Sequence, residues 1–511
     1  DLHLSIRRQR QMCIRDSYMK SESLGAARDK YELTGYPYLN IGSEDFQTNS
    51  GTGSEYTSNS VFGRVIYSYA DRYLFQANVR HDGSSRFAKG YRWGTFPSFS
   101  AGWVASEEKF MKNLKWDWLS FLKLRGSWGM LGNERIGSNY FPYIALMSFG
   151  NSLFYMADGS VVSDKTARPA VLAVEDITWE TTTSTDLGLD VNFLNNRLQF
   201  HFDYYWKETK DMLLNIEIPY FMGYNNPSTN AGKMSTHGYD IEVAWNDQIG
   251  DFKYDINVNF SDFLSKIDYM NDGEQISGGK IKRAGVLFNE FYGYVCEGIY
   301  QTQEEVNNSA RTSTTVTVGD LKYRDISGPD GVPDGVISPE YDRVPLGNSL
   351  PRFQYGGSLN ASYKGIDFSL AFQGIGKQNS YLSTSMVQPL RDNYGNVPAI
   401  LEGKYWSPFN TTEENLAAKY PRLSNVSKSN NYATSSFWMF NGSYFRLKNI
   451  TLGYTLPKSW TQKAGINRAR FYVSGSDLFC LSNFPSGWDP EMGTSDYPIT
   501  TSLVMGIQVN F

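Results

Sequence analysis

The end of the chain alternates strictly between apolar and small or polar side chains. Its apolar positions are Leu503, Met505, Ile507, Val509 and Phe511. Because successive side chains of a strand point to opposite faces, this pattern predicts a strand with one wholly apolar face. Such a face needs no covering layer if it meets lipid and both strand edges are paired. We interpret it as a barrel strand with Phe511 as the barrel assembly signal, although an ordinary strand of a soluble β protein shows the same alternation.

The same alternation recurs in pairs of segments joined by short turns. The pairs are 61–69 with 73–79, 187–193 with 198–206, 241–245 with 254–260, and 359–363 with 368–372. Turn residues such as Asn195, Asn196, Gly250 and Gly365 stand between the segments. Each pair therefore predicts a β-hairpin with one apolar and one polar face.

The connections decide between a soluble sandwich and a membrane barrel, since the polar faces suit both. Long stretches at about 211–232, 268–350 and 376–436 separate successive hairpins. Unstructured connections beyond about 12–15 residues are uncommon in compact soluble domains, whereas outer-membrane barrels combine short turns with long loops. The predicted fold class is all-β, a transmembrane antiparallel β-barrel with long extracellular loops and short periplasmic turns. The sequence supplies about fourteen of its strands.

Composition supports this prediction. Aromatic residues make up 15% of the 511 residues, with 35 Tyr and 31 Phe. No run approaches the roughly 18–20 apolar residues of a membrane helix, so any membrane crossing uses strands. A net charge of −5 without a long basic stretch argues against a nucleic-acid partner. The three cysteines and four histidines are dispersed and form neither a disulfide framework nor a metal motif.

Residues 1–17 differ from everything that follows. They are rich in arginine but lack the apolar core and cleavage site of a signal peptide. The piece RQMCIRDS resembles translated sequencing-adapter sequence. We therefore expect residues 1–17 to be a non-native segment and residues 18–511 to be the native part.

Nine short motifs, in order along the chain, resemble the barrel of SusC/RagA-type TonB-dependent outer-membrane transporters. They are RHDGSSRF at 80–87, WGTFPS at 93–98, GW at 102–103, LKLRGSWG at 122–129, WETT at 179–182, GDLKYRD at 319–325, GNSLP at 347–351, YFRLKNI at 444–450 and DPE at 489–491. Each motif alone is weak, but together they are specific. The resemblance runs from about residue 56 to the C-terminus.

The resemblance implies a barrel of about 22 strands in the outer membrane, filled by an N-terminal plug. It also implies a TonB-contacting segment, through which TonB-ExbB-ExbD acts. Two further implied partners are the barrel assembly machinery and a SusD-like lipoprotein that captures oligosaccharides or peptides. The plug and the first strands are absent from residues 18–511, so we expect this chain to be the C-terminal part of the barrel. Unpaired outer strands would expose backbone groups to lipid.

The sequence contains no nucleophile elbow, zincin motif, phosphate loop or dinucleotide fingerprint, so we predict no enzyme and no cofactor other than calcium. The alternatives to an energised importer are a passive channel or adhesin barrel, and a soluble all-β enzyme. A propeller enzyme would show a repeat of about 40–50 residues, which the sequence lacks.

Two sets of residues are candidates for ligand contacts. The acidic loop at 325–342 echoes a calcium loop, although its register is imperfect, and its candidate ligands are Asp330, Asp334, Glu340 and Asp342. Sugars stack on aromatic rings, so rings on the long loops are candidate substrate contacts, with a place in the aromatic girdle or in loop packing as the alternative role. These rings are Tyr292, Tyr294, Tyr394, Trp406 and Trp438.

Overall fold

The alternating segments form one large antiparallel sheet. The structure, a computed structural model, describes residues 6–31, 35–36, 38–114, 116–135, 140–145, 147–271, 273–384, 387–391, 397, 399–426, 428–493, 497 and 499–511. Within them, the sheet has fourteen strands, which follow one another in chain order. They are β1 (Ile6–Arg28), β2 (Gln47–Tyr69), β3 (Tyr73–Ser84), β4 (Trp93–Val104), β5 (Leu119–Asn133), β8 (Glu180–Phe193), β9 (Leu198–Asn215), β10 (Ser228–Ile249), β11 (Phe252–Met270), β18 (Arg352–Tyr363), β19 (Ile366–Lys377), β22 (Tyr444–Thr455), β23 (Arg468–Ser482) and β24 (Ser502–Asn510).

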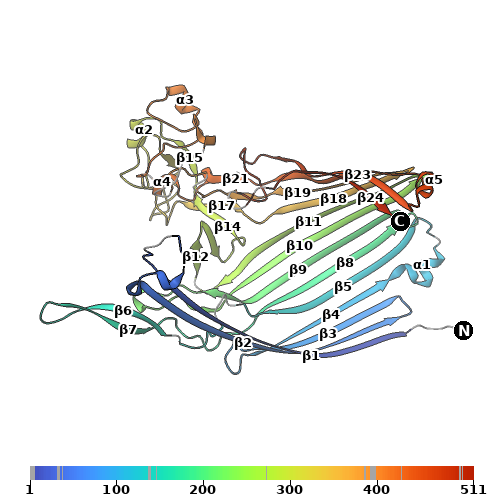
Figure 1. The fold of residues 1–511 in the computed structure, drawn as a ribbon, viewed down its shortest axis with the longest axis horizontal. Helices are drawn as coiled ribbons and strands as arrows, with labels where there is room; N and C mark the ends of the chain where they lie inside the picture. The colour runs from blue at the N-terminus through green and yellow to red at the C-terminus, as the bar shows by residue number, and fades with distance from the viewer. Residues whose placement is uncertain are drawn as a thin grey trace.

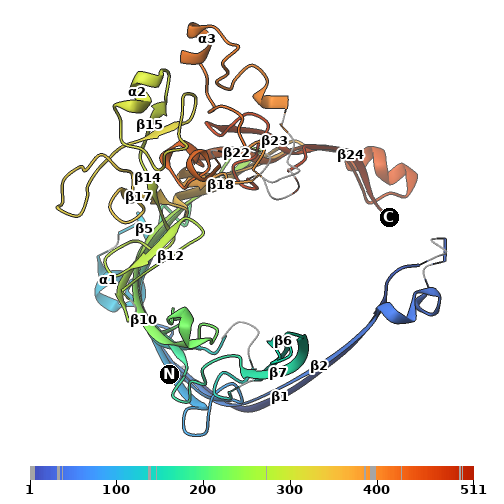
Figure 2. The same ribbon diagram turned by 90° about the vertical axis from the view of Figure 1, so that its left-hand side faces the viewer.

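The sheet is curved into an open arc. Figure 1 shows the strands side by side, and Figure 2 shows their concave and convex sides. In the part of the chain that the structure describes, β1 pairs only with β2 and β24 only with β23. The sheet is therefore a barrel wall with two free edges. We call its concave side the inner face and its convex side the outer face.

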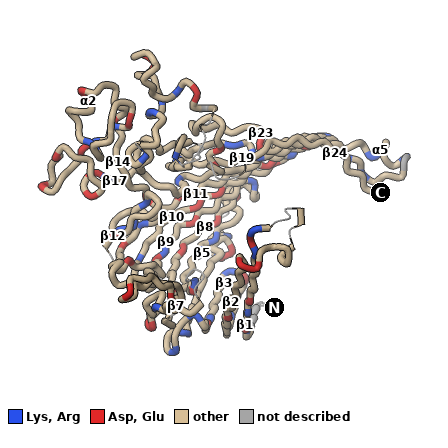
Figure 3. Tube along the Cα trace, turned by 60° about the vertical axis from the view of Figure 1, so that its left-hand side comes forward, with Lys and Arg blue, Asp and Glu red and all other residues tan. Residues whose placement is uncertain are grey.

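Strict alternation gives the two faces different chemistry. On the outer face, Val258 of β11 is 40% exposed and pairs with Val243 of β10. The preceding residue, Asn257, lies on the inner face and donates to Glu242 at 2.6 Å. Charged residues accordingly recur along β5, β8 and β9 (Figure 3). The apolar face that a soluble protein would cover is thus left open to the surroundings.

One end of the sheet, the turn end, carries the tight connections. Residues 70–72, 194–197, 250–251 and 364–365 join neighbouring strands there. Asn195, Gly250 and Gly365 have positive φ, which explains why Asn and Gly stand at these turns. Two turn-end connections are longer than the sequence pattern indicated: 105–118 contains α1 (Lys109–Asn113), and 456–467 contains α5 (Lys458–Thr461).

The opposite end, the loop end, carries a folded loop lobe. We define the loop lobe as the described residues of 273–348 and 379–441 (Figure 1). Its elements are β12 (Glu274–Ser277), β13 (Lys280–Arg283), β14 (Glu290–Tyr294), β15 (Cys296–Ile299), α2 (Gln303–Asn307), β16 (Leu321–Tyr323), β17 (Arg343–Asn348), β20 (Asn379–Tyr381), α3 (Thr412–Leu416), α4 (Lys428–Asn431) and β21 (Met439–Asn441). A separate hairpin, β6 (Met147–Tyr155) and β7 (Val161–Pro169), also projects from the loop end.

The loop lobe has cores of its own. One contains Tyr294, Leu321, Tyr323 and Ile337, and another contains Tyr300, Val306 and Val316. The connections predicted at 268–350 and 376–436 are therefore long, as expected, but folded. The connection predicted at 211–232 is shorter, because β9 continues to Asn215 and β10 begins at Ser228.

Candidate functional site

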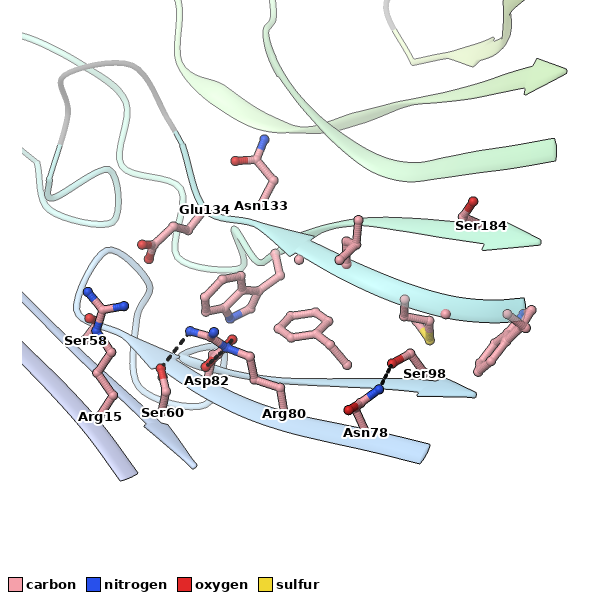
Figure 4. Close-up of a pocket in the computed structure, with 18 of the residues that line it drawn as sticks. Arg15, Ser58, Ser60, Asn78, Arg80, Asp82, Ser98, Asn133, Glu134 and Ser184 are labelled. Atoms are coloured by element: carbon pink, nitrogen blue, oxygen red, sulfur yellow. Dashed lines mark hydrogen bonds and ion pairs between the residues drawn. The ribbon is translucent and has the colours of Figure 1, made fainter. Parts of the chain in front are cut away.

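A hollow on the inner face lies between β2, β3, β4 and β5 near the loop end. Its volume is about 950 Å³, and the edge of β1 contributes Arg15 and Ser17 (Figure 4). Because strand side chains alternate, each strand presents a row of polar residues to this hollow. We call it the wall cavity. It is the candidate functional site.

Arg80 organises one wall of the cavity. Its Nε donates to both carboxylate oxygens of Asp82 at 2.7 and 2.6 Å, and its Nη2 donates to Ser60 Oγ at 3.1 Å. On the neighbouring positions, Asn78 Nδ2 donates to Ser98 Oγ at 3.2 Å. These groups lie in a row along the inner face (Figure 4). The wall thus offers guanidinium, carboxylate, amide and hydroxyl groups to a polar solute.

The rim of the cavity joins residues far apart in the sequence. The hydroxyl of Tyr56 donates to Glu134, which follows the end of β5. The guanidinium of Arg86 lies 5.3 Å from the ring centre of Tyr56 and 4.5 Å from that of Tyr140. No sequence pattern predicted this rim. Although Arg86 belongs to the RHDGSSRF motif, no local pattern links Tyr56 to Glu134.

An aromatic cluster closes the loop end of the cavity. Phe87, Phe96, Ile177 and Trp179 are buried together, and the rings of Phe96 and Trp179 meet edge to face at 5.4 Å. The Trp179 indole donates to the carbonyl of Arg92 at 3.1 Å, which fixes its orientation. The WGTFPS and WETT motifs, recognised only as landmarks, therefore meet in one cluster.

Gly132 leaves room for the ring of Phe96, and this gives a first prediction. A Cβ at Gly132 would lie 2.0 Å from Phe96 Cζ, whereas a Cβ at Gly126 on the same strand would be 3.4 Å from Leu187 Cδ2. We expect Gly132→Ala to destabilise the protein by roughly 1–3 kcal/mol, because the buried ring must move. Urea unfolding in vesicles measures the loss. Gly126→Ala is the control, and an equal effect of both substitutions would contradict the role of Gly132.

A charged network continues the inner face beyond the cavity. Arg125 of β5 donates to Asp203 of β9 at 2.5 and 2.7 Å and to Asp190 of β8 at 3.1 and 3.2 Å. His201 also lies 3.0 Å from Asp190. These contacts tie β5, β8 and β9 together across the inner face. They make it a surface suited to water and polar solutes rather than to lipid.

The buried Arg446 brings a distant loop onto the inner face. Arg446 of β22 is 3% exposed, and its Nη2 donates to Asp489 at 2.6 Å. Its Nε lies 2.5 Å from Glu491. The YFRLKNI and DPE motifs of the sequence therefore meet through one ion-pair cluster.

The rings predicted to contact substrate lie inside the loop lobe. Tyr292 and Tyr294 are each 8% exposed on β14, Trp406 is 9% exposed, and Trp438 is fully buried. The indole of Trp438 donates to the carbonyl of Asn431 at 2.8 Å. Tyr394 lies outside the described residues. The structure gives the four described rings a part in loop packing, and their contact with a substrate stays a prediction.

The predicted calcium ligands are spread along their loop. Asp342 is fully buried and accepts backbone N–H groups of Ile326, Ser327 and Ser338, at 2.7, 3.2 and 2.7 Å. Asp334 accepts the N–H of Val336 at 2.9 Å, while Asp330 and Glu340 are exposed. Among the residues that the structure describes, no three His, Cys, Asp or Glu side chains are grouped to hold a metal ion. These contacts give Asp342 and Asp334 a role in shaping the loop.

Cys296 provides a second prediction, because burial in the loop lobe raises the pKa of its thiol to about 11. The thiolate is the reactive form, so the folded lobe should protect Cys296 from alkylation at pH 8. We expect the rate of Cys296 alkylation to rise as the pH approaches that pKa, and also when the lobe unfolds. Mass spectrometry after iodoacetamide treatment measures this rate. Alkylation at pH 8 as fast in the folded protein as in urea would contradict the prediction.

An open antiparallel wall with an apolar outer face and a polar, cavity-bearing inner face defines the class of transmembrane β-barrels. A family profile described as "TonB dependent receptor-like, beta-barrel" matches residues 16–474. The chain therefore belongs to the TonB-dependent receptor β-barrel family, whose members are outer-membrane proteins, and its turn end and loop end are the periplasmic and extracellular ends. None of the described helices is both long enough and apolar enough to cross a membrane.

Named relatives agree with this assignment. TonB-dependent receptor P3 of Formosa agariphila is 31% identical, over 88% of this chain and 45% of the relative. TonB-dependent receptor SusC of Bacteroides thetaiotaomicron is 30% identical, over 88% and 43%. The chain spans about half the length of the curated relatives it matches. This confirms the predicted resemblance to the SusC type.

Solved structures show the same fold. The structure of the RagAB peptide transporter matches with a TM-score of 0.76 and 24% identity, over 99% of this chain and 53% of that chain. Another structure of RagAB, in the 'open-open' state, matches with a TM-score of 0.73 and 22% identity, over the same shares. The predicted all-β barrel fold is thus confirmed.

Proposed function

We propose that this chain is the C-terminal part of the barrel of an energised outer-membrane importer, which takes up oligosaccharides or peptides and performs no covalent chemistry. The observation that carries the proposal is the polar inner face with its cavity of about 950 Å³, backed by an apolar outer face. Such a wall separates an aqueous path from lipid. The wall cavity lies on that path, near its extracellular end.

The partners follow from the same proposal. A SusD-like lipoprotein would cover the extracellular end and deliver the substrate, and TonB-ExbB-ExbD would act through an N-terminal part that residues 18–511 do not include. Outer-membrane lipid would surround the outer face, and the barrel assembly machinery would recognise the end of β24. Phe511 is 85% exposed there, which suits recognition by another protein.

The groups of the wall cavity suit both substrate classes. Arg80, Asp82 and Asn78 present charged and amide groups, which hydrogen-bond either to sugar hydroxyls or to peptide groups. The RagAB structures, which share the fold, are described as those of a peptide transporter or importer. Oligosaccharides and peptides are therefore both candidate substrates, and both must be tested.

Uptake by cells tests the proposal. The gene for the whole protein is deleted, and radiolabelled oligosaccharides and peptides are offered to the cells with and without a protonophore. We expect one substrate class to lose uptake on deletion, to regain it with the wild-type gene and to lose it again with the protonophore. Uptake that persists with the protonophore would favour a passive channel instead. Unchanged uptake of every substrate after deletion would overturn the importer.

Residues 1–17 need a separate test. We propose that they are non-native, although the structure pairs Ile6–Arg28 with β2 along its whole length and Arg15 lines the wall cavity. Reading the genomic DNA upstream of Tyr18 decides the matter. Codons for residues 1–17 in the genome would overturn the proposal, whereas codons for further alternating strands and a plug would support it.

Calcium binding to the loop at 325–342 also remains a proposal. Carboxylates from one short segment suit a hard cation, but two of the four candidates already accept backbone N–H groups. Calorimetric titration of the whole protein with calcium tests this directly. A titration without heat would end the proposal.

A further inference from the structure

The connection 105–118, which we call the β4–β5 connector, folds back onto the outer face at the periplasmic end. Its Glu108 is 9% exposed and accepts the Tyr73 hydroxyl at 2.5 Å and the Trp103 indole N–H at 3.2 Å. Arg72 also donates to Glu108 at 2.8 Å. Tyr73 and Trp103 are direct neighbours on β3 and β4, and Tyr73 is 46% exposed on the outer face. Glu108 thus fastens the connector to the lipid side.

The figures place the connector on the same side. In Figure 2, α1 lies outside the arc of the sheet, and Figure 1 places it at the turn end. Residues on the outer side of a barrel wall at this level meet the boundary between acyl chains and headgroups. A connection that merely closed a turn would need neither a helix nor a buried carboxylate.

The exposed side chains of the connector are large and apolar. Phe110 is 55% exposed, Leu114 48% and Trp116 44%. The β22–β23 connection repeats the feature, with Trp460 64% exposed in α5. Large exposed rings carry a cost in water, and Trp in particular gathers at membrane interfaces, where its ring is apolar and its N–H stays hydrated.

A row of stacked rings joins the connector to the outer face. Trp116 stacks on Trp118 with ring centres 5.3 Å apart, and Trp118 stacks on Phe193 of β8 at 5.7 Å. Phe193 lies in register with Leu119 at the beginning of β5. The exposed rings therefore continue the lipid-facing surface without a break. Lys109 and Lys112 are exposed beside them, with stems long enough to reach the headgroups.

We propose that the β4–β5 connector is an interfacial membrane anchor, which inserts Phe110, Leu114 and Trp116 at the headgroup boundary of the phospholipid leaflet on the periplasmic side. The occupant of this apolar surface is lipid, because the surface is continuous with the lipid-facing wall. The anchor holds the rim of the barrel at a fixed depth while substrate passes on the inner face. It requires no particular substrate and is independent of the importer proposal.

Depth-dependent quenching tests the anchor in the full-length protein. Cys13, Cys296 and Cys480 are replaced by alanine, Phe110→Cys is introduced, and its thiol is labelled with a small fluorophore. The protein is then folded into phosphatidylethanolamine–phosphatidylcholine vesicles that contain nitroxide lipids. We expect strong quenching by nitroxides at the headgroup and upper acyl chain, and weaker quenching by a nitroxide near the chain end. Iodide in the buffer should quench poorly.

Two further variants keep the test decisive. Asp251→Cys places the label in the short periplasmic turn between β10 and β11, where the native side chain is 68% exposed, and should show strong iodide and weak lipid quenching. Glu108→Ala combined with Phe110→Cys should reduce lipid quenching several-fold while the barrel stays folded, as judged by its electrophoretic mobility before and after heating. Equal lipid quenching at positions 110 and 251 would overturn the proposal. The proposal would also be overturned if the label at position 110 were protected from iodide only at a high ratio of protein to lipid. That outcome would indicate that a second copy of the protein, rather than lipid, covers the connector.

Discussion

Val258→Arg is expected to destabilise the protein in a membrane by roughly 2–4 kcal/mol, since a charged side chain on the lipid face of a barrel costs this much near the midplane. Val258 lies on the outer face in register with Val243, between the aromatic residues Tyr254 and Phe260 of the same strand. Urea unfolding of the full-length protein in vesicles measures the change. The size of the loss reports how deep the position lies, so this experiment tests the membrane placement of the sheet.

The matched control is the preceding residue. Asn257 lies on the inner face, where its amide donates to Glu242 at 2.6 Å. We expect Asn257→Arg to leave stability nearly unchanged, because the new guanidinium faces water and can pair with the same carboxylate. If both substitutions destabilise equally, the assignment of inner and outer faces is wrong.

Removing the carboxylate of Asp320 is expected to unfold the loop lobe locally. Asp320 is fully buried and accepts from Arg422 at 2.7 and 3.3 Å and from Asn431 at 3.0 Å. It thereby joins the two long connections, 102 residues apart in the sequence. Breaking a buried ion pair from one side costs roughly 3–5 kcal/mol, so Asp320→Ala should lose that much local stability. Hydrogen exchange of β16 and α4 measures it.

A nearby ion pair that is only half-buried provides the control for Asp320. Lys322 and Glu305 lie 3.1 Å apart, with side chains 25% and 32% exposed. Ion pairs that water can reach contribute about 0–1 kcal/mol, and Gln keeps a side-chain oxygen at this position, so Glu305→Gln should change hydrogen exchange far less than Asp320→Ala does. Hydrogen exchange as slow in Asp320→Ala as in the wild type would contradict the prediction. It would show that the apolar cores of the loop lobe alone hold the two connections together. Cys296 should become reactive in the same variant, which gives an independent readout.

The loop lobe changes how the long extracellular connections are understood. Their aromatic residues were predicted as substrate contacts because sugars stack on rings, but Trp438 is fully buried and Tyr294 belongs to a core. A lobe with its own core is a preformed surface rather than a set of loose strands of chain. Any partner at the extracellular end would meet a folded body. Removal of the loop lobe should leave the barrel wall intact.

Alternation of apolar and polar residues was enough to predict four hairpins, the last strand, their tight turns and the two faces, whereas it did not delimit β1, β4, β5, β22 or β23. It succeeded because a wall between lipid and water must repeat the same pattern in every strand, so local sequence carries the information. The hairpin turns at Asn195 and Gly250 were recognised for a similar reason, since positive φ restricts which residues fit. The motifs identified the family in advance, but they did not reveal that Arg446 would meet Asp489 and Glu491.

Only the tertiary structure brought together residues without a shared local pattern. Tyr56 and Glu134 form the cavity rim, Asp320 and Arg422 close the loop lobe, and Glu108 fastens the β4–β5 connector to Tyr73. Each pair joins strands or connections that become neighbours only when the sheet curves and its ends fold back. Buried polar contacts of this kind depend on the distance between side chains rather than on sequence periodicity, so the cavity, the lobe and the anchor were decided by the fold.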